Sequence, residues 1–343
     1  MKTRKIIKLL SIVLAAGLAL SLSGCMSVSI REDDVREELP VIDPEDGVAR
    51  EIGMTCYYRL RGEDCLVAVE RQVAVRAGER TELAVIRELM SGAPEENQSV
   101  EGLFIEGAEV TGVTLDEGIL SVTLSSSFMS EIYYDIAEYE AKTALSNGEI
   151  TQQECDARIA AALDELHTSR RLAVYSIVNT ISGYGGNIAV QLIVESGSGT
   201  LRLTGGDIGI GDDVTSQFEP LGALSFDESY VATPELIMQY YLEHIRLAEY
   251  ELAYRLISVT GDGMPRPTYA DFQKDINSAG KLESFKITGV DAAGDRAAVS
   301  ISMTFADAQG VKRTAECTVS MIEEDGFTKI GYMTFKEGLV SAG

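Results

Sequence analysis

Residues 296–322, RAAVSISMTFADAQGVKRTAECTVSMI, decide how the C-terminal third of the chain folds. Apolar and polar residues alternate along both arms, which is the pattern of two half-buried β-strands. A three-residue loop at 308–310 sets Ile301 opposite Cys317, whereas a four-residue loop would set each apolar face against a polar one. The pattern therefore predicts an antiparallel hairpin with Gly310 in the left-handed conformation.

The sequence around this hairpin predicts one long helix packed on a curved antiparallel sheet. Further strands are expected near 285–291 and 327–336, the second after a tight Asp-Gly turn at 325–326. Upstream, Thr-Pro-Glu at 233–235 supplies an N-cap and a first-turn proline, and begins a helix expected to reach about Val259. Its apolar residues recur every three or four positions, so one stripe must face a core.

A second folded region precedes this one and has the predicted element order β, β, α, β, β, α, β. The elements are expected at residues 55–60, 66–75, 81–91, 109–115, 119–125, 169–182 and 188–194. This order predicts a compact domain with helices on one face of a sheet. The fold class of the chain is therefore α+β, with two small α+β domains.

A helical hairpin is predicted as an insert at residues 131–166. Residues 133–145 have a helical pattern, and Thr151 with Glu154 forms a capping box that begins a second helix through residue 166. The first helix has an aromatic face made by Tyr133, Tyr134, Ile136 and Tyr139. This face could meet a partner protein. Most amphipathic stripes bury against their own chain, however, so we expect it to cover its own domain.

Several segments of the first region carry a family resemblance. They are Tyr-Tyr at 57–58, LVAVER at 66–71, LMSGA at 89–93, residues 119–128, IVNTI at 177–181 and residues 190–197. In order and spacing they resemble the GerMN domain over about residues 54–205. That family is named for a bacterial spore germination and sporulation lipoprotein. The resemblance implies an endospore-forming or related Gram-positive bacterium.

The last 110 or so residues resemble a second family. One long helix on a curved sheet, with Asp-Gly-Phe-Thr-Lys-Ile at 325–330, is similar to the SnoaL-like, nuclear transport factor 2-like superfamily. The resemblance implies that any enzyme of this kind works in the cone between helix and sheet. Because the residues predicted to face that cone are mostly apolar, we expect the cone to be filled.

The N-terminus has the pattern of an exported bacterial lipoprotein. Four basic residues, Lys2, Arg4, Lys5 and Lys8, form a positive N-terminal end, residues 6–22 supply the apolar stretch, and Leu-Ser-Gly-Cys closes it at 22–25. This sequence resembles the bacterial lipobox. The resemblance implies that Cys25 receives a diacylglyceryl group, that residues 1–24 are removed, and that the new amino terminus is acylated, for example with palmitate. Two or more acyl chains anchor a protein stably. The alternative is an uncleaved membrane helix with an incidental cysteine.

These patterns predict the domain organisation and the location. The expected parts are a signal peptide (1–24), an acidic flexible tether (25–50), a GerMN-like domain (51–205), a connector (206–228) and a SnoaL-like domain (229–343). The formal charge is −25, so nucleic acid and anionic lipid headgroups are excluded as partners held by charge. We expect the protein on the extracytoplasmic face of the cell membrane, held by the lipid on Cys25.

Side chains that could carry catalysis are scarce. The two histidines, His167 and His244, fall on predicted helices, where a surface or core-edge position is expected. The sequence has no Cys-x-x-Cys motif and no Cys/His cluster, so it offers no zinc or dithiol site. Four cysteines are expected to be unpaired: Cys56, Cys65, Cys155 and Cys317. We therefore expect no catalytic, cofactor-binding or metal-binding residues.

Two hypotheses for the function follow. The first is a non-catalytic envelope lipoprotein, a scaffold that binds an envelope protein or the cell wall in sporulation, germination or cell-wall-associated assembly. The alternative is an extracytoplasmic small-ligand-binding protein or enzyme that uses the C-terminal cone. An open cone with convergent polar groups would favour the alternative, and a packed interior would favour the scaffold.

Overall fold

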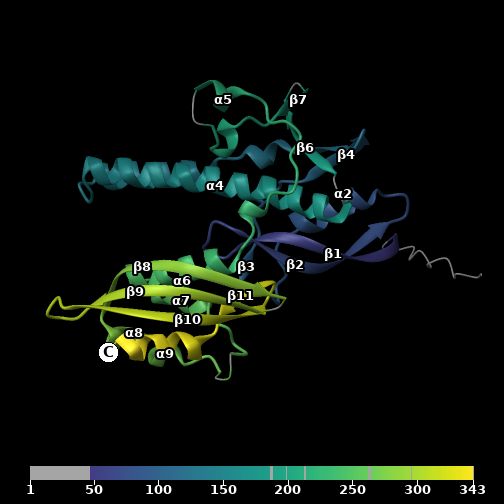
Figure 1. Cartoon of the computed structure of the whole chain (residues 1–343). Coiled ribbons are helices and arrows are strands. Elements are labelled where there is room, and N and C mark those ends of the chain that lie inside the picture. The colour runs from purple at the N-terminus through teal and green to yellow at the C-terminus, as the bar shows by residue number, and fades with distance from the viewer. Residues whose placement is uncertain are drawn as a thin grey trace, which may run out of the picture. The chain divides into compact units, whose positions relative to one another are not determined.

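The computed structural model describes residues 47–185, 188–197, 199–211, 214–261, 263, 265–294 and 296–342. The predicted signal peptide, Cys25 and the tether up to residue 46 lie outside the described residues. Asp46–Gly343 forms one compact unit, and its fold is α+β, as the sequence predicts (Figure 1). The division of this unit into separate domains stays a prediction.

Two sheets enclose two helices in the N-terminal half, residues 47–203. The first sheet has the order β2–β1–β3: β1 (Val48–Leu60), β2 (Leu66–Arg76) and β3 (Val100–Glu101). The second has the order β4–β5–β6–β7: β4 (Val110–Asp116), β5 (Ile119–Leu124), β6 (Ala189–Ser196) and β7 (Gly199–Arg202). Helices α2 (Thr81–Met90) and α4 (Gln152–Gly185) contact strands of both sheets, and Figure 1 shows α4 between them.

The prediction of helices on one face of a single sheet is therefore wrong. Every residue of α4 from Leu172 to Ser182 is buried, polar residues included. A helix that is buried all round needs a layer on either side. On the β1 side, Ser176 donates a hydrogen bond to the carbonyl oxygen of Tyr57 at 2.5 Å, and the Tyr57 amide donates to Thr180 at 3.1 Å. These side chains supply hydrogen-bond partners for the Tyr57 carbonyl and amide, which point away from β2.

The predicted helical hairpin consists of α3 (Ile132–Ser146) and the first half of α4. The capping box is confirmed, because the Thr151 amide donates to Glu154 Oε2 at 2.8 Å and the Glu154 amide donates to Thr151 Oγ1 at 3.2 Å. The expected break between residues 166 and 169 does not occur. The sequence contains no glycine or proline from 152 to 182, so nothing ends the helix there. The hairpin, hereafter the arm (residues 131–166), is thus a rigid extension of the core helix.

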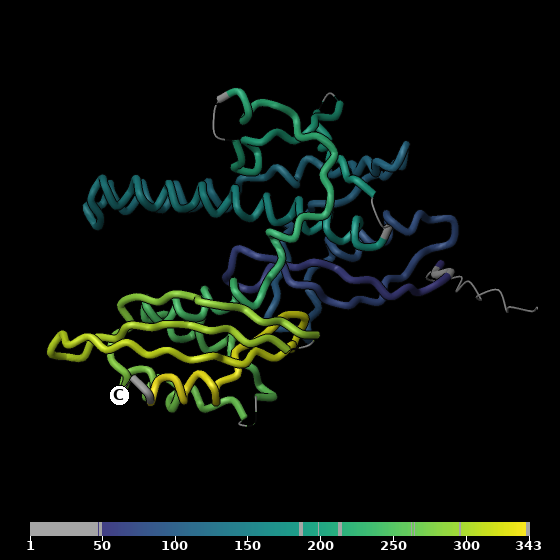
Figure 2. The backbone as a smooth tube through the Cα atoms, in the orientation of Figure 1, coloured from purple at the N-terminus to yellow at the C-terminus, as the bar shows by residue number. Residues whose placement is uncertain are grey.

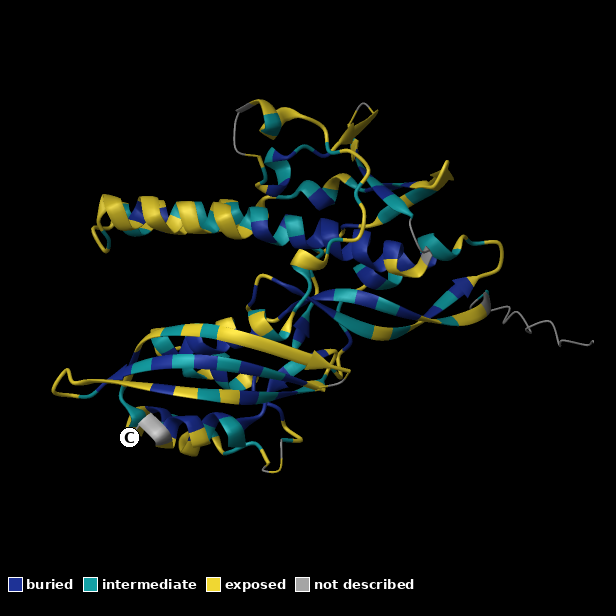
Figure 3. Cartoon of the chain, in the orientation of Figure 1, coloured by how far each residue is buried: buried dark blue, intermediate teal, exposed yellow. Residues whose placement is uncertain are grey.

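Three of the four residues of the aromatic face are exposed to solvent, and Tyr134 is half-buried (Figure 3). Tyr133 is 73% exposed, Tyr139 71% and Ile136 48%. The expectation that this face covers its own domain is therefore wrong. The two helices instead pack on each other along another face, where Ala141 and Cys155 are buried.

Helices cover one face of a four-stranded antiparallel sheet in the C-terminal half, residues 233–342. The helices are α6 (Pro234–Leu247), α7 (Tyr250–Arg255), α8 (Tyr269–Ala279) and α9 (Tyr332–Ala342). The strands, in the order β11–β10–β9–β8, are β8 (Lys281–Ala293), β9 (Arg296–Ala306), β10 (Lys312–Glu324) and β11 (Phe327–Ile330). Figure 2 traces the β9–β10 hairpin. Its predicted register is confirmed, with Ile301 opposite Cys317 and Gly310 at φ 79°.

Two predicted boundaries of this half are wrong, and one helix was not predicted. The long helix ends at Ala248, whose φ of 62° is left-handed; this break lets Glu249 turn back to bond His244. The last strand ends at Ile330, because Tyr332, Phe335 and Leu339 follow at helical spacing and are buried on α9. The sequence pattern predicts no element at helix α8.

The cone between helices and sheet is packed with side chains. The rings of Tyr241 and Phe335 lie 4.9 Å apart in an edge-to-face arrangement, and those of Phe272 and Tyr332 lie 6.0 Å apart. These four residues are buried, as is Phe305 on the sheet. These side chains fill the space between helices and sheet, as the sequence predicts.

The two halves are linked by residues 204–232. This segment contains α5 (Val214–Phe218) and the short 3₁₀ turns η2 (Gly206–Ile208) and η3 (Glu228–Tyr230), and a further turn, η1 (Ser126–Met129), follows β5. Buried Asn179 of α4 exchanges two hydrogen bonds of 3.0 Å with the backbone of Asp227. The link is therefore fixed to the core of the N-terminal half.

No helix in the described ranges is both long enough and apolar enough to cross a membrane.

Candidate functional site

The turn between β10 and β11 forms one contact between the two halves. Asn97 Nδ2 donates to the carbonyl oxygen of Asp325 at 3.2 Å, and Ser99 Oγ donates to Asp325 Oδ2 at 3.2 Å. Lys329, which is 3% exposed, donates to Ser99 Oγ at 3.3 Å and also forms ion pairs with Glu324 and Asp325. Such a buried ammonium is stabilised only because carboxylates surround it.

A histidine between two carboxylates forms the second contact. Glu63 lies in the β1–β2 turn and is 5% exposed; its Oε1 lies 2.6 Å from His244 Nε2. On the other side of the ring, Glu249 Oε2 lies 2.9 Å from Nδ1. Burial alone would lower the pKa of His244, but the hydrogen bonds to Glu63 and Glu249 outweigh it and raise that pKa. Only the imidazolium can donate to both carboxylates at once.

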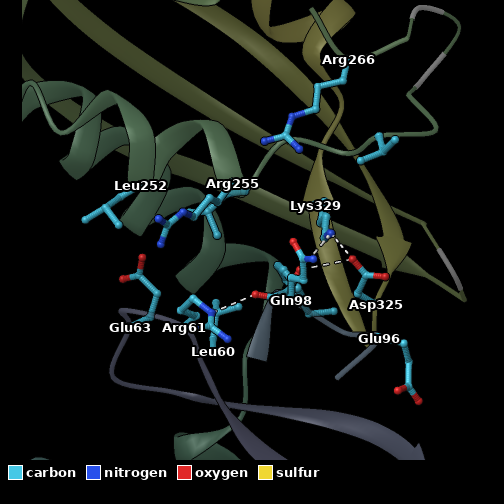
Figure 4. Close-up of a pocket in the computed structure, with 14 residues that line it drawn as sticks. Leu60, Arg61, Glu63, Glu96, Gln98, Leu252, Arg255, Arg266, Asp325 and Lys329 are labelled. Atoms are coloured by element: carbon cyan, nitrogen blue, oxygen red, sulfur yellow. Dashed lines mark hydrogen bonds and ion pairs between the residues drawn. The ribbon is translucent and has the colours of Figure 1, made fainter. Parts of the chain in front are cut away.

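A cleft of about 580 Å³ lies between these two contacts (Figure 4). Both halves line it, the N-terminal half through residues 60–63 and 96–99 and the C-terminal half through α7, the segment after it and the β10–β11 turn. Its charged residues are Arg61, Arg255, Arg266, Lys329, Glu63, Glu96 and Asp325. Its apolar residues are Leu60, Leu252, Leu256, Val259 and Phe327.

Three arginines of the cleft have no acidic partner among the residues that the structure describes. Arg61 donates to the carbonyl oxygens of Gln98 and Val100, both at 2.9 Å. The guanidinium carbon of Arg266 lies 3.8 Å from the ring centroid of Tyr254, and burial lowers the pKa of Arg266. Arg255 is exposed on α7. Within the ranges that the structure describes, no carboxylate forms an ion pair with any of the three.

Glu324 holds the rim of the cleft in place. Its carboxylate accepts hydrogen bonds from the amide of Thr260 at 3.1 Å, from Ser258 Oγ at 2.8 Å and from the amide of Val259 at 3.1 Å. Burial would raise the pKa of Glu324, but these bonds and Lys329 lower it to about 2. The carboxylate is therefore ionised at neutral pH, and its oxygens already accept hydrogen bonds from the protein.

The structure describes some, but not all, of the residues that the sequence singles out. Cys25 lies outside the described residues, so its lipidation stays a prediction. His167 is half-buried, as expected, whereas His244 is buried between the halves, which the sequence did not predict. The other four cysteines are unpaired, and the described residues contain no cluster of acidic, histidine or cysteine side chains that could hold a metal ion.

The cleft residues belong to segments that the sequence pattern did not connect. The sequence pattern predicts no functional role for Arg61, Glu63, Arg255, Arg266 or Lys329. The one available signal is the turn itself, Arg-Gly-Glu-Asp at 61–64, which carries three charges where a tight turn needs none. Only the fold shows that this turn faces α6 and α7.

Comparison with known proteins does not identify the chain. No protein-family model matches it, and no curated protein matches it in sequence. The GerMN and SnoaL-like resemblances therefore stay proposals.

Solved structures similar to part of the chain include three that each match about a third of it. TsrD from Streptomyces laurentii is 12% identical over 31% of this chain and 92% of its own, with a TM-score of 0.23. AclR from Streptomyces galilaeus is 13% identical over 31% and 83%, with a TM-score of 0.24. An LEH-like epoxide hydrolase from M. tuberculosis is 12% identical over 32% and 91%, with a TM-score of 0.23. Similarities at this level carry no argument about the activity of this chain.

Proposed function

We propose that the chain is a lipid-anchored extracytoplasmic protein that binds a protein of the cell envelope without chemically changing it. The setting suggested by the GerMN resemblance is sporulation, germination or cell-wall-associated assembly. One observation carries the proposal: the arm holds a solvent-exposed aromatic face on a helix that continues into the core of the protein. Exposed apolar side chains that lie together on a surface are typical of protein interaction sites.

The charge of the arm indicates the kind of partner. Residues 131–166 contain nine acidic and two basic side chains, so the aromatic face is surrounded by negative charge. A partner with an apolar patch inside a basic rim would match it. The arm extends α4 directly, so little conformational freedom is lost when the partner binds.

The packed cone supports binding in place of catalysis. SnoaL-like enzymes would need room between helices and sheet, and here aromatic rings occupy that space. The buried imidazole of His244 is engaged on both nitrogens by Glu63 and Glu249. A general base needs a free nitrogen within reach of its substrate, so this histidine is placed for stability.

Lipid anchoring predicts the result of replacing Cys25. Because the thioether at Cys25 would hold the acyl chains, we expect Cys25→Ala to move the protein from the membrane to the soluble fraction of the native host. Fractionation followed by immunoblotting measures this. Cys155→Ala, which changes a thiol on the arm, is the control and should leave the protein at the membrane. Retention of the Cys25 variant in the membrane would contradict anchoring.

Partner binding predicts the result of changing the arm. Removing two exposed rings with Tyr133→Ser and Tyr139→Ser is expected to weaken capture of the cross-linked envelope partner by at least about tenfold, since aromatic side chains dominate interface energies. Quantitative mass spectrometry after cross-linking in the native host gives the readout. Phe218→Ser is a matched control, because Phe218 is 75% exposed but lies on α5. Equal capture by the double variant and the unaltered protein would contradict the proposal.

A further inference from the structure

The cleft between the halves concentrates positive charge in a strongly acidic chain. The sequence has 29 lysines and arginines against 54 aspartates and glutamates, yet four cations and three carboxylates line the cleft. Two of those carboxylates are already engaged, Glu63 by His244 and Asp325 by Lys329. Glu96 is the remaining carboxylate of the lining, and no ion pair in the described structure joins it to Arg61, Arg255 or Arg266.

We infer that this cleft binds a small organic oxyanion, with a carboxylate or phosphate as the group that the arginines recognise. The planar guanidinium fork matches both groups through paired hydrogen bonds. Figure 4 shows Arg61, Arg255 and Arg266 on different segments around the same space. Arg266 is fixed in place by the protein itself: its Nη2 donates to the carbonyl oxygen of Tyr254 and its guanidinium lies over the Tyr254 ring. A guanidinium that is already held in position loses little conformational freedom when an oxyanion binds.

The shape and the apolar side of the cleft indicate the rest of the ligand. A volume of about 580 Å³ lies within the range of small-molecule sites. Among the apolar lining residues, Leu252 is half-buried and Val259 is exposed. An apolar or aromatic body beside the anionic group would cover these two side chains. The inference goes beyond the proposed function, because a partner on the arm and a ligand in the cleft would occupy separate surfaces.

Calorimetric titration of the detergent-solubilised full chain at low salt tests the inference. The probes are phenyl phosphate, benzoate and the neutral control benzyl alcohol, which share a benzene ring. We expect at least one oxyanion to bind, benzyl alcohol not to bind, and the affinity to fall as salt is added. Binding of phenyl phosphate alone would assign a phosphate ester, and binding of benzoate alone would assign a carboxylate.

Two variants show whether binding occurs in the cleft. Arg255→Gln removes an exposed guanidinium with no protein partner, so it should fold normally and weaken binding by about tenfold, the value of one charge-assisted hydrogen bond. Arg202→Gln is the matched control, because Arg202 is exposed on β7 and does not line the cleft. Absence of binding by both oxyanions would overturn the inference. Equal loss of affinity in the two variants would overturn it too. Neither result depends on the arm or on Cys25, so both are distinguishable from failure of the proposed function.

Discussion

Replacing His244 by alanine is expected to lower the free energy of unfolding by about 3 to 5 kcal/mol, because it leaves the buried carboxylate of Glu63 without its cation. The Glu63 side chain has little access to water that could replace the imidazolium. Urea denaturation followed by circular dichroism measures the change. Glu249→Gln is the matched control. Glu249 is about half exposed, and an exposed ion pair contributes at most about 1 kcal/mol.

The same contact predicts how stability depends on pH. The folded state raises the pKa of His244 above its value in the unfolded chain, so the folded state holds the proton more tightly. The stabilisation is fully present below the unfolded pKa of about 6.5 and is lost as pH rises through the folded pKa. The unfolding midpoint should therefore fall as pH is raised above about 6.5. His244→Ala should remove that part of the dependence, and an unchanged pH profile in the variant would contradict the assignment.

The parts of the fold that could be predicted from the sequence are those fixed by neighbouring residues. The register of the β9–β10 hairpin follows from a two-residue period, since any slip would turn Ile301 toward solvent. The capping box at Thr151 and the N-cap at Thr233 are likewise local signals, and both are present. These features need no knowledge of the rest of the chain.

The wrong predictions concern features that depend on distant parts of the chain. Whether α4 is covered on one side or on two depends on where the second sheet packs. The helical pattern of residues 172–182 does not indicate the position of that sheet. The exposure of Tyr133 depends on the continuity of α4, which carries the arm away from the sheets. The left-handed Ala248 ends α6 early and brings Glu249 within 2.9 Å of His244. The other carboxylate on this ring, Glu63, comes from the N-terminal half of the molecule.

The cleft could not be predicted for the same physical reason. Its arginines have no shared spacing, because Arg61 comes from a hairpin turn, Arg255 from the end of α7 and Arg266 from the segment after it. Each would count as an ordinary surface charge when considered alone. The three arginines have in common that no carboxylate of the described residues forms an ion pair with them. This can be seen only in the folded structure, where residues of both halves line the cleft. Side chains that lie far apart in sequence therefore form the candidate site.

The turn at Gly326 tests how strongly the halves depend on each other. This glycine has φ 91°, and a Cβ added to it would lie 2.0 Å from the carbonyl oxygen of Ala68 on β2. Gly326→Ala must therefore displace the β10–β11 turn from the N-terminal half. We expect a loss of about 3 kcal/mol in the free energy of unfolding, from left-handed strain of about 1 to 2 kcal/mol together with overpacking of about 1 to 3 kcal/mol.

Gly310→Ala separates these two contributions. Gly310 is also left-handed, at φ 79°, but a Cβ there meets no atom within 4 Å, so the variant should lose only the strain of about 1 to 2 kcal/mol. The local readout is hydrogen exchange of the Ala232 amide in the linking segment, which donates at 2.8 Å to the carbonyl oxygen of Leu66, two residues before Ala68 on β2. Exchange at Ala232 should rise in Gly326→Ala and stay unchanged in Gly310→Ala. Equal destabilisation of the two variants, with Ala232 protected in both, would mean that the halves do not support each other through this turn. The cleft between them would then lack a fixed shape.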